Sequence, residues 1–231
     1  MTGRRRWLTA AYAALSLADT VLVGSGPRGR PAHYVVKPLL MPALAAGLAE
    51  SAGTADPVVR RVLAAQAFSW GGDVALMSSR ERDFLAGVAS FFGAHLAYVG
   101  AFRELGTGSP RESRTGRAVL ALSSALVPGN AVAAHRKDAR FGLPIGVYGT
   151  VLTAMATAAA VLEDSAGSSR IRAGAALFLL SDSLIGAQQF LRDEPHPALE
   201  SAVMATYTAG QWLISDGVQR STGPQPGPVH M

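Results

Sequence analysis

Five ionisable side chains stand inside long apolar stretches of this sequence, and each could do chemistry there. They are Asp19, Lys37, Asp73, His95 and Asp182. A charged side chain at the centre of a bilayer costs at least about 2.5–3.5 kcal/mol, so such residues mark candidate functional sites. Carboxyl, imidazole and amine groups together could perform acid–base catalysis or relay protons.

The spacing of the polar residues predicts helices with inward-facing stripes. Gln66, Ser69 and Asp73 follow an i, i+3, i+7 pattern, which places them on one face of a helix. Three further segments carry stripes of the same kind: Phe91, His95 and Tyr98; Ser181, Asp182 and Gln189; and Tyr207, Gln211 and Ser215. Polar stripes of this kind turn away from lipid and toward neighbouring helices.

The depths of these residues agree with one another. Asp19, Asp73 and Asp182 lie in the C-terminal halves of the first, third and seventh apolar stretches, and Lys37 lies near the start of the second. Because odd helices end where even helices begin, all four should approach one membrane face, with His95 deeper. We therefore predict that the Asp73 and Asp182 carboxyls meet in one buried pocket and share a proton, as a coupled acid–base pair.

Eight side chains are predicted to bind substrate or support the two catalytic aspartates. They are Lys37, Ser69, His95, Tyr98, Ser181, Tyr207, Gln211 and Asp19. A structural interpretation stays open for each of them. The aspartates could simply be buried and bonded to neighbours or to Lys37, and the neutral polar residues could serve helix packing.

The composition favours a membrane protein over a soluble one. Of 231 residues, 49% are hydrophobic and only 16% are charged, against about 25% in a typical soluble domain. The net charge of +5 comes from arginines scattered between apolar runs, so we expect no nucleic-acid partner. Without cysteine, disulfides and thiolate metal sites are impossible.

The predicted fold is an all-α polytopic bundle of eight transmembrane helices over residues 1–220, with a disordered tail over residues 221–231. The spans are Trp7–Gly24, His33–Ala49, Val58–Met77, Phe84–Phe102, Ala118–Ala134, Phe141–Leu162, Ile171–Phe190 and Ala198–Ser215. The second and fifth are expected to be the weakest, because they are short and contain prolines. Reading the first span as a signal peptide is less favoured, since seven more spans follow.

The arginines and lysines also predict an orientation. Twelve lie on the side of the two termini and eight on the opposite side, which favours cytoplasmic termini. The Arg- and Ala-rich composition indicates a bacterium with a high-GC genome, so we expect the inner membrane. No GxSxG elbow, P-loop or HExxH motif is present, and no metal or other cofactor is predicted. A carboxylate-coupled transporter or a lipid-binding protein remains the alternative to an enzyme.

Several motifs, taken in order, resemble the YhhN family of integral membrane proteins. The motifs are KPLLMP at residues 37–42, AFSWGGD at residues 67–73, the series Phe84, Gly87, Phe91, His95, Tyr98 and Phe102, GAALFLLSD at residues 174–182, and YTAGQ at residues 207–211. The resemblance runs from the first span to the eighth.

This resemblance implies an eight-span fold and lysoplasmalogenase activity. Such enzymes hydrolyse the vinyl-ether bond of a lysophospholipid, the lysoplasmalogen, to a fatty aldehyde and a glycerophospho-alcohol. It also implies that two intramembrane aspartates, here Asp73 and Asp182, are essential. The partners implied are the lysophospholipid substrate and the bilayer itself.

Overall fold

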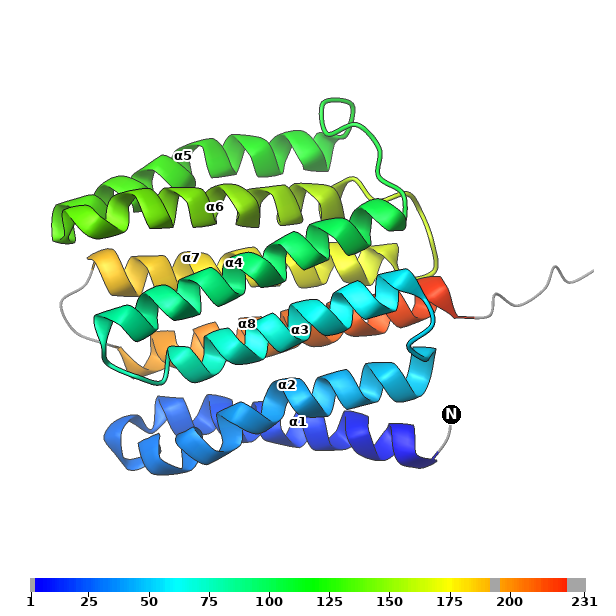
Figure 1. Cartoon of the computed structure of the whole chain (residues 1–231), viewed down its shortest axis with the longest axis horizontal. Helices are drawn as coiled ribbons and strands as arrows, with labels where there is room; N and C mark the ends of the chain where they lie inside the picture. The colour runs from blue at the N-terminus through cyan, green and yellow to red at the C-terminus, as the bar shows by residue number, and fades with distance from the viewer. Residues whose placement is uncertain (1–2, 192–195, 224–231) are drawn as a thin grey trace, which may run out of the picture.

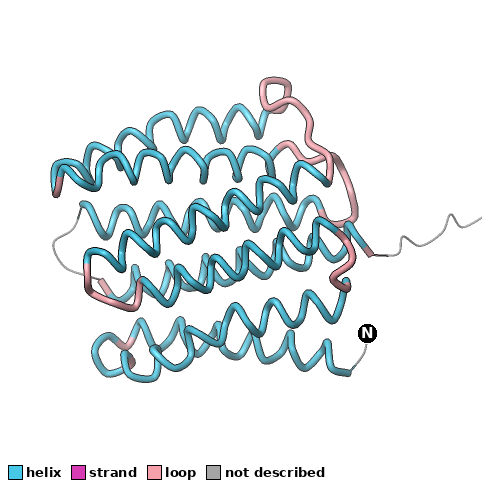
Figure 2. Tube along the Cα trace, viewed as in Figure 1, coloured by secondary structure: helices cyan, strands magenta, loops and turns pink. Residues whose placement is uncertain are grey.

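The computed structural model describes residues 3–191 and 196–223 as a bundle of eight long, roughly parallel α-helices (Figure 1). The helices are α1 (Gly3–Gly24), α2 (Arg30–Ala52), α3 (Pro57–Ala75), α4 (Glu81–Glu104), α5 (Arg114–Lys137), α6 (Ala139–Ala160), α7 (Ser168–Leu191) and α8 (Pro197–Thr222), with a single 3₁₀ turn, η1, at Gly26–Arg28. The connections between them are short (Figure 2). The start of α1 and the end of α8 lie at the same end of the bundle.

Local chemistry explains where several helices begin. The Asp56 carboxylate accepts a hydrogen bond from the Val58 N–H at 2.7 Å, and Pro57 takes the first helical position of α3. Ser113 caps α5 in the same way, and Asp138 ends α5 while its side chain caps α6. These caps allow each helix to start immediately after a short turn.

The prolines inside α2 do not break that helix. Pro42 has no N–H, so the carbonyl of Pro38 loses its usual partner one turn away. The indole Nε1 of Trp70 on α3 donates to this carbonyl at 2.9 Å. A neighbouring helix therefore satisfies the freed carbonyl, as an apolar environment requires.

Successive helices pair as antiparallel hairpins, with α5 and α6 at one edge of the bundle and α1 and α2 at the other (Figure 1). The α7–α8 pair is the tightest. A Cβ on Gly174 would lie only 2.7 Å from the carbonyl oxygen of Gly210, and a Cβ on Gly210 would lie 2.8 Å from the oxygen of Gly174. These glycines therefore let two backbones approach closely, as small residues do in membrane bundles.

All eight predicted segments are helical, but six of them are long and apolar enough by themselves to cross a membrane. The expectation about the weakest spans was wrong. Helices α2 and α5 each contain a continuous apolar stretch that meets the criterion, whereas α3 and α8 contain no such stretch. Helix α8 also continues to Thr222, two residues into the predicted tail, and residues 224–231 of that tail lie outside the described part.

Candidate active site

Asp73 is buried near the end of α3, between Lys37 and Tyr207. Its Oδ1 lies 3.6 Å from Nζ of Lys37, and its Oδ2 accepts a hydrogen bond of 2.7 Å from the Tyr207 hydroxyl. Lys37 comes from the start of α2 and Tyr207 from α8, so three helices hold this carboxyl. This contact agrees with the expectation that Lys37 and Asp73 approach the same end of the bundle, and it is also the contact that the structural interpretation allowed.

Asp73 begins a series of polar contacts between α3 and α8, which we call the polar seam. One turn further along, Gln211 donates from its Nε2 to the hydroxyl of Ser69 at 3.0 Å, and Tyr98 of α4 donates to the Gln211 carbonyl. Gln66 donates to Ser215 at 2.6 Å at the next level. The seam is explained by the antiparallel packing of two stripes that each have helical spacing.

Asp182 lies in a second cluster. Its Oδ2 accepts a hydrogen bond from the Tyr148 hydroxyl of α6 and lies 3.4 Å from Nε2 of His95 on α4. The His95 Nε2 also lies 3.0 Å from the Tyr148 oxygen, so the three side chains form a closed triangle. His95 is fully buried, and its Nδ1 finds no partner in the described part of the chain.

Aromatic rings lie between the two clusters. The ring centroid of Phe178 is 5.4 Å from that of Tyr207 and 5.0 Å from that of His95. Each carboxyl has its own tyrosine donor and its own basic neighbour. The structure therefore contains two adjacent clusters joined by aromatic contacts, in place of the single shared pair expected from the sequence.

Two residues near these clusters were missing from the predicted site. Tyr148 lies in the predicted span Phe141–Leu162 but was not among the candidate site residues. His33 was overlooked, although it precedes Lys37 by one helical turn on the same face of α2. Its Nδ1 lies 2.7 Å from Oδ1 of Asp19, which is fully buried.

Ser181 has a packing contact: its hydroxyl donates to the Val203 carbonyl of α8 at 3.1 Å. It joins α7 to α8 next to Asp182 and does not bond either catalytic candidate. Among residues 3–191 and 196–223, no three histidine, aspartate or glutamate side chains gather in a way that could hold a metal ion.

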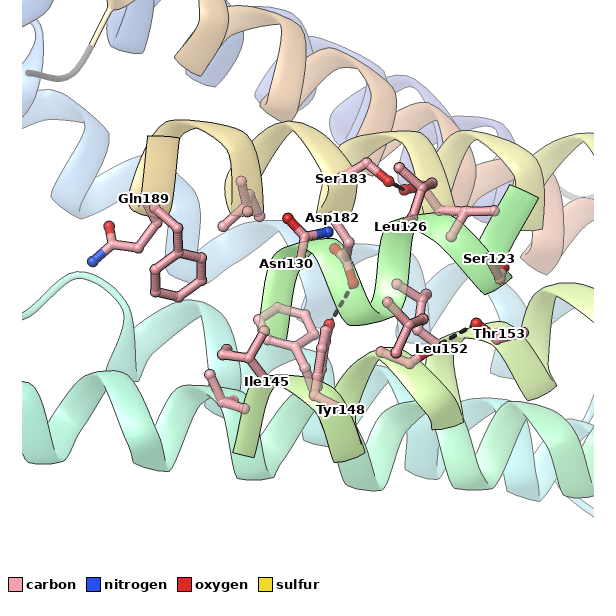
Figure 3. Close-up of a pocket in the computed structure, with 18 of the residues that line it drawn as sticks. Ser123, Leu126, Asn130, Ile145, Tyr148, Leu152, Thr153, Asp182, Ser183 and Gln189 are labelled. Atoms are coloured by element: carbon pink, nitrogen blue, oxygen red, sulfur yellow. Dashed lines mark hydrogen bonds between the residues drawn. The ribbon is translucent and has the colours of Figure 1, made fainter. Parts of the chain in front are cut away.

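An apolar cavity, here called the groove, lies between α4, α5, α6 and α7 (Figure 3). Asp182 and Tyr148 point toward one another across it. Its polar lining residues are Ser123, Asn130, Tyr148, Thr153, Asp182, Ser183 and Gln189. Most of the remaining lining is aliphatic or aromatic, so the groove suits a hydrocarbon chain with one polar end.

The groove adjoins a polar cavity, here called the vestibule, at the end of the bundle where α1 stops and α2 starts. The two cavities share Leu76, Phe84, Ile185 and Gln189. The ionisable residues that line the vestibule are His33, Lys37, Arg80, Glu81 and Glu200. An apolar cavity next to a charged one matches the polarity pattern of a lipid with a polar headgroup.

Comparisons with known proteins agree with this architecture. The profile of the YhhN family matches residues 32–218, which is most of the chain, so the chain belongs to the YhhN family. It is also 34% identical over 144 residues to the human protein named Lysoplasmalogenase TMEM86B; the match covers 62% of this chain and 57% of that relative. The matched region thus spans somewhat over half of the relative's length. No solved structure gives a significant match. Family membership and the six apolar helices identify an integral membrane protein.

Proposed function

We propose that this member of the YhhN family is a membrane hydrolase that cleaves the vinyl-ether bond of lysoplasmalogens. One observation carries the proposal: Asp182 lines an apolar groove that adjoins a charged vestibule. The name of the human relative supplies the substrate class, since it is a lysoplasmalogenase. A single-chain lipid could place its tail in the groove and its headgroup in the vestibule, with the ether bond near the carboxyl.

All eight helices, including α3 and α8, are proposed to cross the membrane. The 19 residues of α3 span about 28 Å at 1.5 Å per residue, close to the thickness of the hydrocarbon core. The polarity that lowers its hydropathy is largely turned inward, because Gln66, Ser69 and Asp73 are buried in the polar seam. The arginine excess on the side of the termini supports cytoplasmic ends, and we place the protein in a bacterial inner membrane.

Vinyl ethers hydrolyse after protonation of the carbon β to the oxygen, which leaves an oxocarbenium ion. Asp182 is the proposed acid, because it is the candidate carboxyl that lines the groove. Its proton goes to the β-carbon, and a water molecule then adds to the cation and loses a proton to the carboxylate. The resulting hemiacetal collapses to an aldehyde as its hydroxyl proton passes to the departing glycerol oxygen. The net change is the addition of one water molecule, and the acid is restored.

The surrounding residues support this cycle through position and charge. The triangle of His95, Tyr148 and Asp182 fixes the carboxyl and gives its proton a path to the imidazole. Asp73 lies beyond the Phe178 ring in its own cluster and would place negative charge near the cation. Lys37 lines the vestibule and would hold both Asp73 and the substrate phosphate. General acid–base catalysis is worth about 10²–10⁴-fold in rate.

The test is aldehyde release from a 1-alkenyl lysophospholipid by the purified protein in detergent. Asp182→Asn should lower kcat by about 10²-fold or more, because the proposed acid is lost. Asp73→Asn should lower kcat by a smaller factor, because the cation loses a nearby negative charge. The matched control is Asp164→Asn, because Asp164 is a strongly exposed aspartate beyond the end of α6. Full activity in both site variants would defeat the acid–base proposal. Proton-coupled solute flux without aldehyde release would favour the transporter alternative.

A further inference from the structure

Asn130 is a polar residue in the groove that the proposed mechanism does not use. It comes from the middle of α5 and lines the groove, where Figure 3 shows it near Asp182. None of the hydrogen bonds among the described residues involves its side-chain amide, whereas the Thr153 and Ser183 hydroxyls are satisfied by carbonyls of their own helices. An amide in apolar surroundings is costly without a partner, so a bound ligand is the natural source of one.

The packing of α5 against α7 fixes where this amide lies. A Cβ built on Gly186 would be 3.1 Å from Oδ1 of Asn130. Gly186 follows Asp182 by four residues, which places it one turn away on the same face of α7. The amide therefore lies against α7 within about one helical turn of the proposed acid, and the absence of a side chain at residue 186 makes room for it.

We propose that Asn130 binds the free hydroxyl of the substrate's glycerol and thereby selects single-chain lipids. The inference rests on the proposed function. In a lysoplasmalogen the vinyl-ether oxygen is attached to the first glycerol carbon, and the free hydroxyl is attached to the second. When Asp182 protonates the alkenyl chain, that hydroxyl lies only a few bonds from the reacting carbon. An amide can both donate to and accept from a hydroxyl, whereas a second acyl chain at this position would remove the donor and add bulk.

The experiment compares a 1-alkenyl lysophospholipid with its 2-deoxy analogue, which lacks only the hydroxyl. Wild-type kcat/KM should be about 3- to 10-fold lower on the deoxy analogue, the size of one neutral hydrogen bond. Asn130→Leu should lower kcat/KM on the hydroxyl substrate. The variant should then have the same kcat/KM on both substrates. Asn130→Ser, which keeps a donor and an acceptor, should retain part of the preference. The control is Ser124→Ala on the same helix, because the Ser124 hydroxyl bonds to the Ala121 carbonyl outside the groove.

A second variant approaches the same amide from α7. Gly186→Ala would put a methyl group 3.1 Å from the Asn130 oxygen, so the amide must shift. The ratio of kcat/KM between the two substrates should then fall toward one while the protein stays folded. An unchanged ratio in both Asn130→Leu and Gly186→Ala would overturn the inference.

Binding measurements separate this inference from the proposed function. The saturated 1-alkyl lysophospholipid and its 2-deoxy analogue cannot be hydrolysed by vinyl-ether chemistry, so their Kd values report recognition alone. A 3- to 10-fold preference of the wild type for the hydroxyl form, lost in Asn130→Leu, would support the role of Asn130 even if no aldehyde were released. Equal affinities of the wild type for the two lipids would contradict it, whatever the hydrolysis assay shows.

Discussion

The polar seam and the groove each contain one candidate aspartate, fully enclosed in the seam and partly exposed in the groove, and they surround it differently. In the seam, Asp73 is held by Lys37 and Tyr207, and the side chains along α3 and α8 largely bond to one another. In the groove, Asp182 bonds to Tyr148 beside an open apolar cavity, and Asn130 has no described partner. The same residue type thus takes part in a closed network in one region and faces free space in the other.

This difference distinguishes polar side chains that hold helices together from polar side chains that can bind a ligand. A buried network in which each member has a partner makes helix packing specific, and it is costly to interrupt. A polar group that faces a cavity keeps hydrogen-bonding capacity for a ligand. Both regions lie in the same bundle, so variants that perturb one at a time can test whether the distinction is real.

The largest effect on stability is expected at Lys37. Lys37→Met leaves the buried Asp73 carboxylate without its basic neighbour, and removal of one partner of a buried pair costs about 3–5 kcal/mol. The double variant Lys37→Met/Asp73→Asn should recover most of that loss, because the uncompensated charge is gone. Thermal unfolding in detergent measures the stability of the single and of the double variant. A double variant no more stable than Lys37→Met would mean that the pair is not what stabilises this end of the bundle.

A smaller effect on stability is expected when Tyr207 or Tyr148 loses its hydroxyl, and the two losses should differ. Tyr207→Phe removes a hydrogen bond to Asp73 inside the closed seam and should lower unfolding stability by about 1.5–3 kcal/mol. Tyr148→Phe should change stability less, because water or ligand in the groove can replace the lost donor, but it should lower kcat for aldehyde release. Equal losses of stability in the two variants would erase the proposed distinction between seam and groove.

The smallest expected effect on unfolding stability concerns the turn between α5 and α6. These two helices form the outer wall of the groove. Hydrogen bonds from the Arg140 side chain and backbone lower the pKa of the exposed Asp138 from 3.8 to about 2. Because the folded pKa is depressed, this stabilisation is present above about pH 4 and is lost as the pH falls toward 2. The unfolding temperature of the wild type should therefore drop slightly more over this window than that of Asp138→Asn. A larger drop in the variant would contradict the assignment.

Much of the site could be predicted because helical periodicity is a local property. The stripe of Gln66, Ser69 and Asp73 identified the buried face of α3, and counting spans correctly placed Lys37 at the same end as Asp73. The Asp19–His33 contact was accessible by the same reasoning, since His33 lies one turn before Lys37. Depth alone cannot tell which partner a side chain meets, so the separate environments of Asp73 and Asp182 were not foreseen.

The sequence by itself determined the all-helical architecture, the approximate bounds of eight helices and the inward face of four of them. These properties follow from apolar length and a 3.6-residue period, which act within one segment. Only the tertiary structure decided that Tyr148 meets Asp182, that Phe178 lies between the two clusters, and that four helices leave a groove next to a charged vestibule. Those features depend on which helices become neighbours and how closely they approach. Small residues such as Gly174 and Gly210 set that distance between α7 and α8.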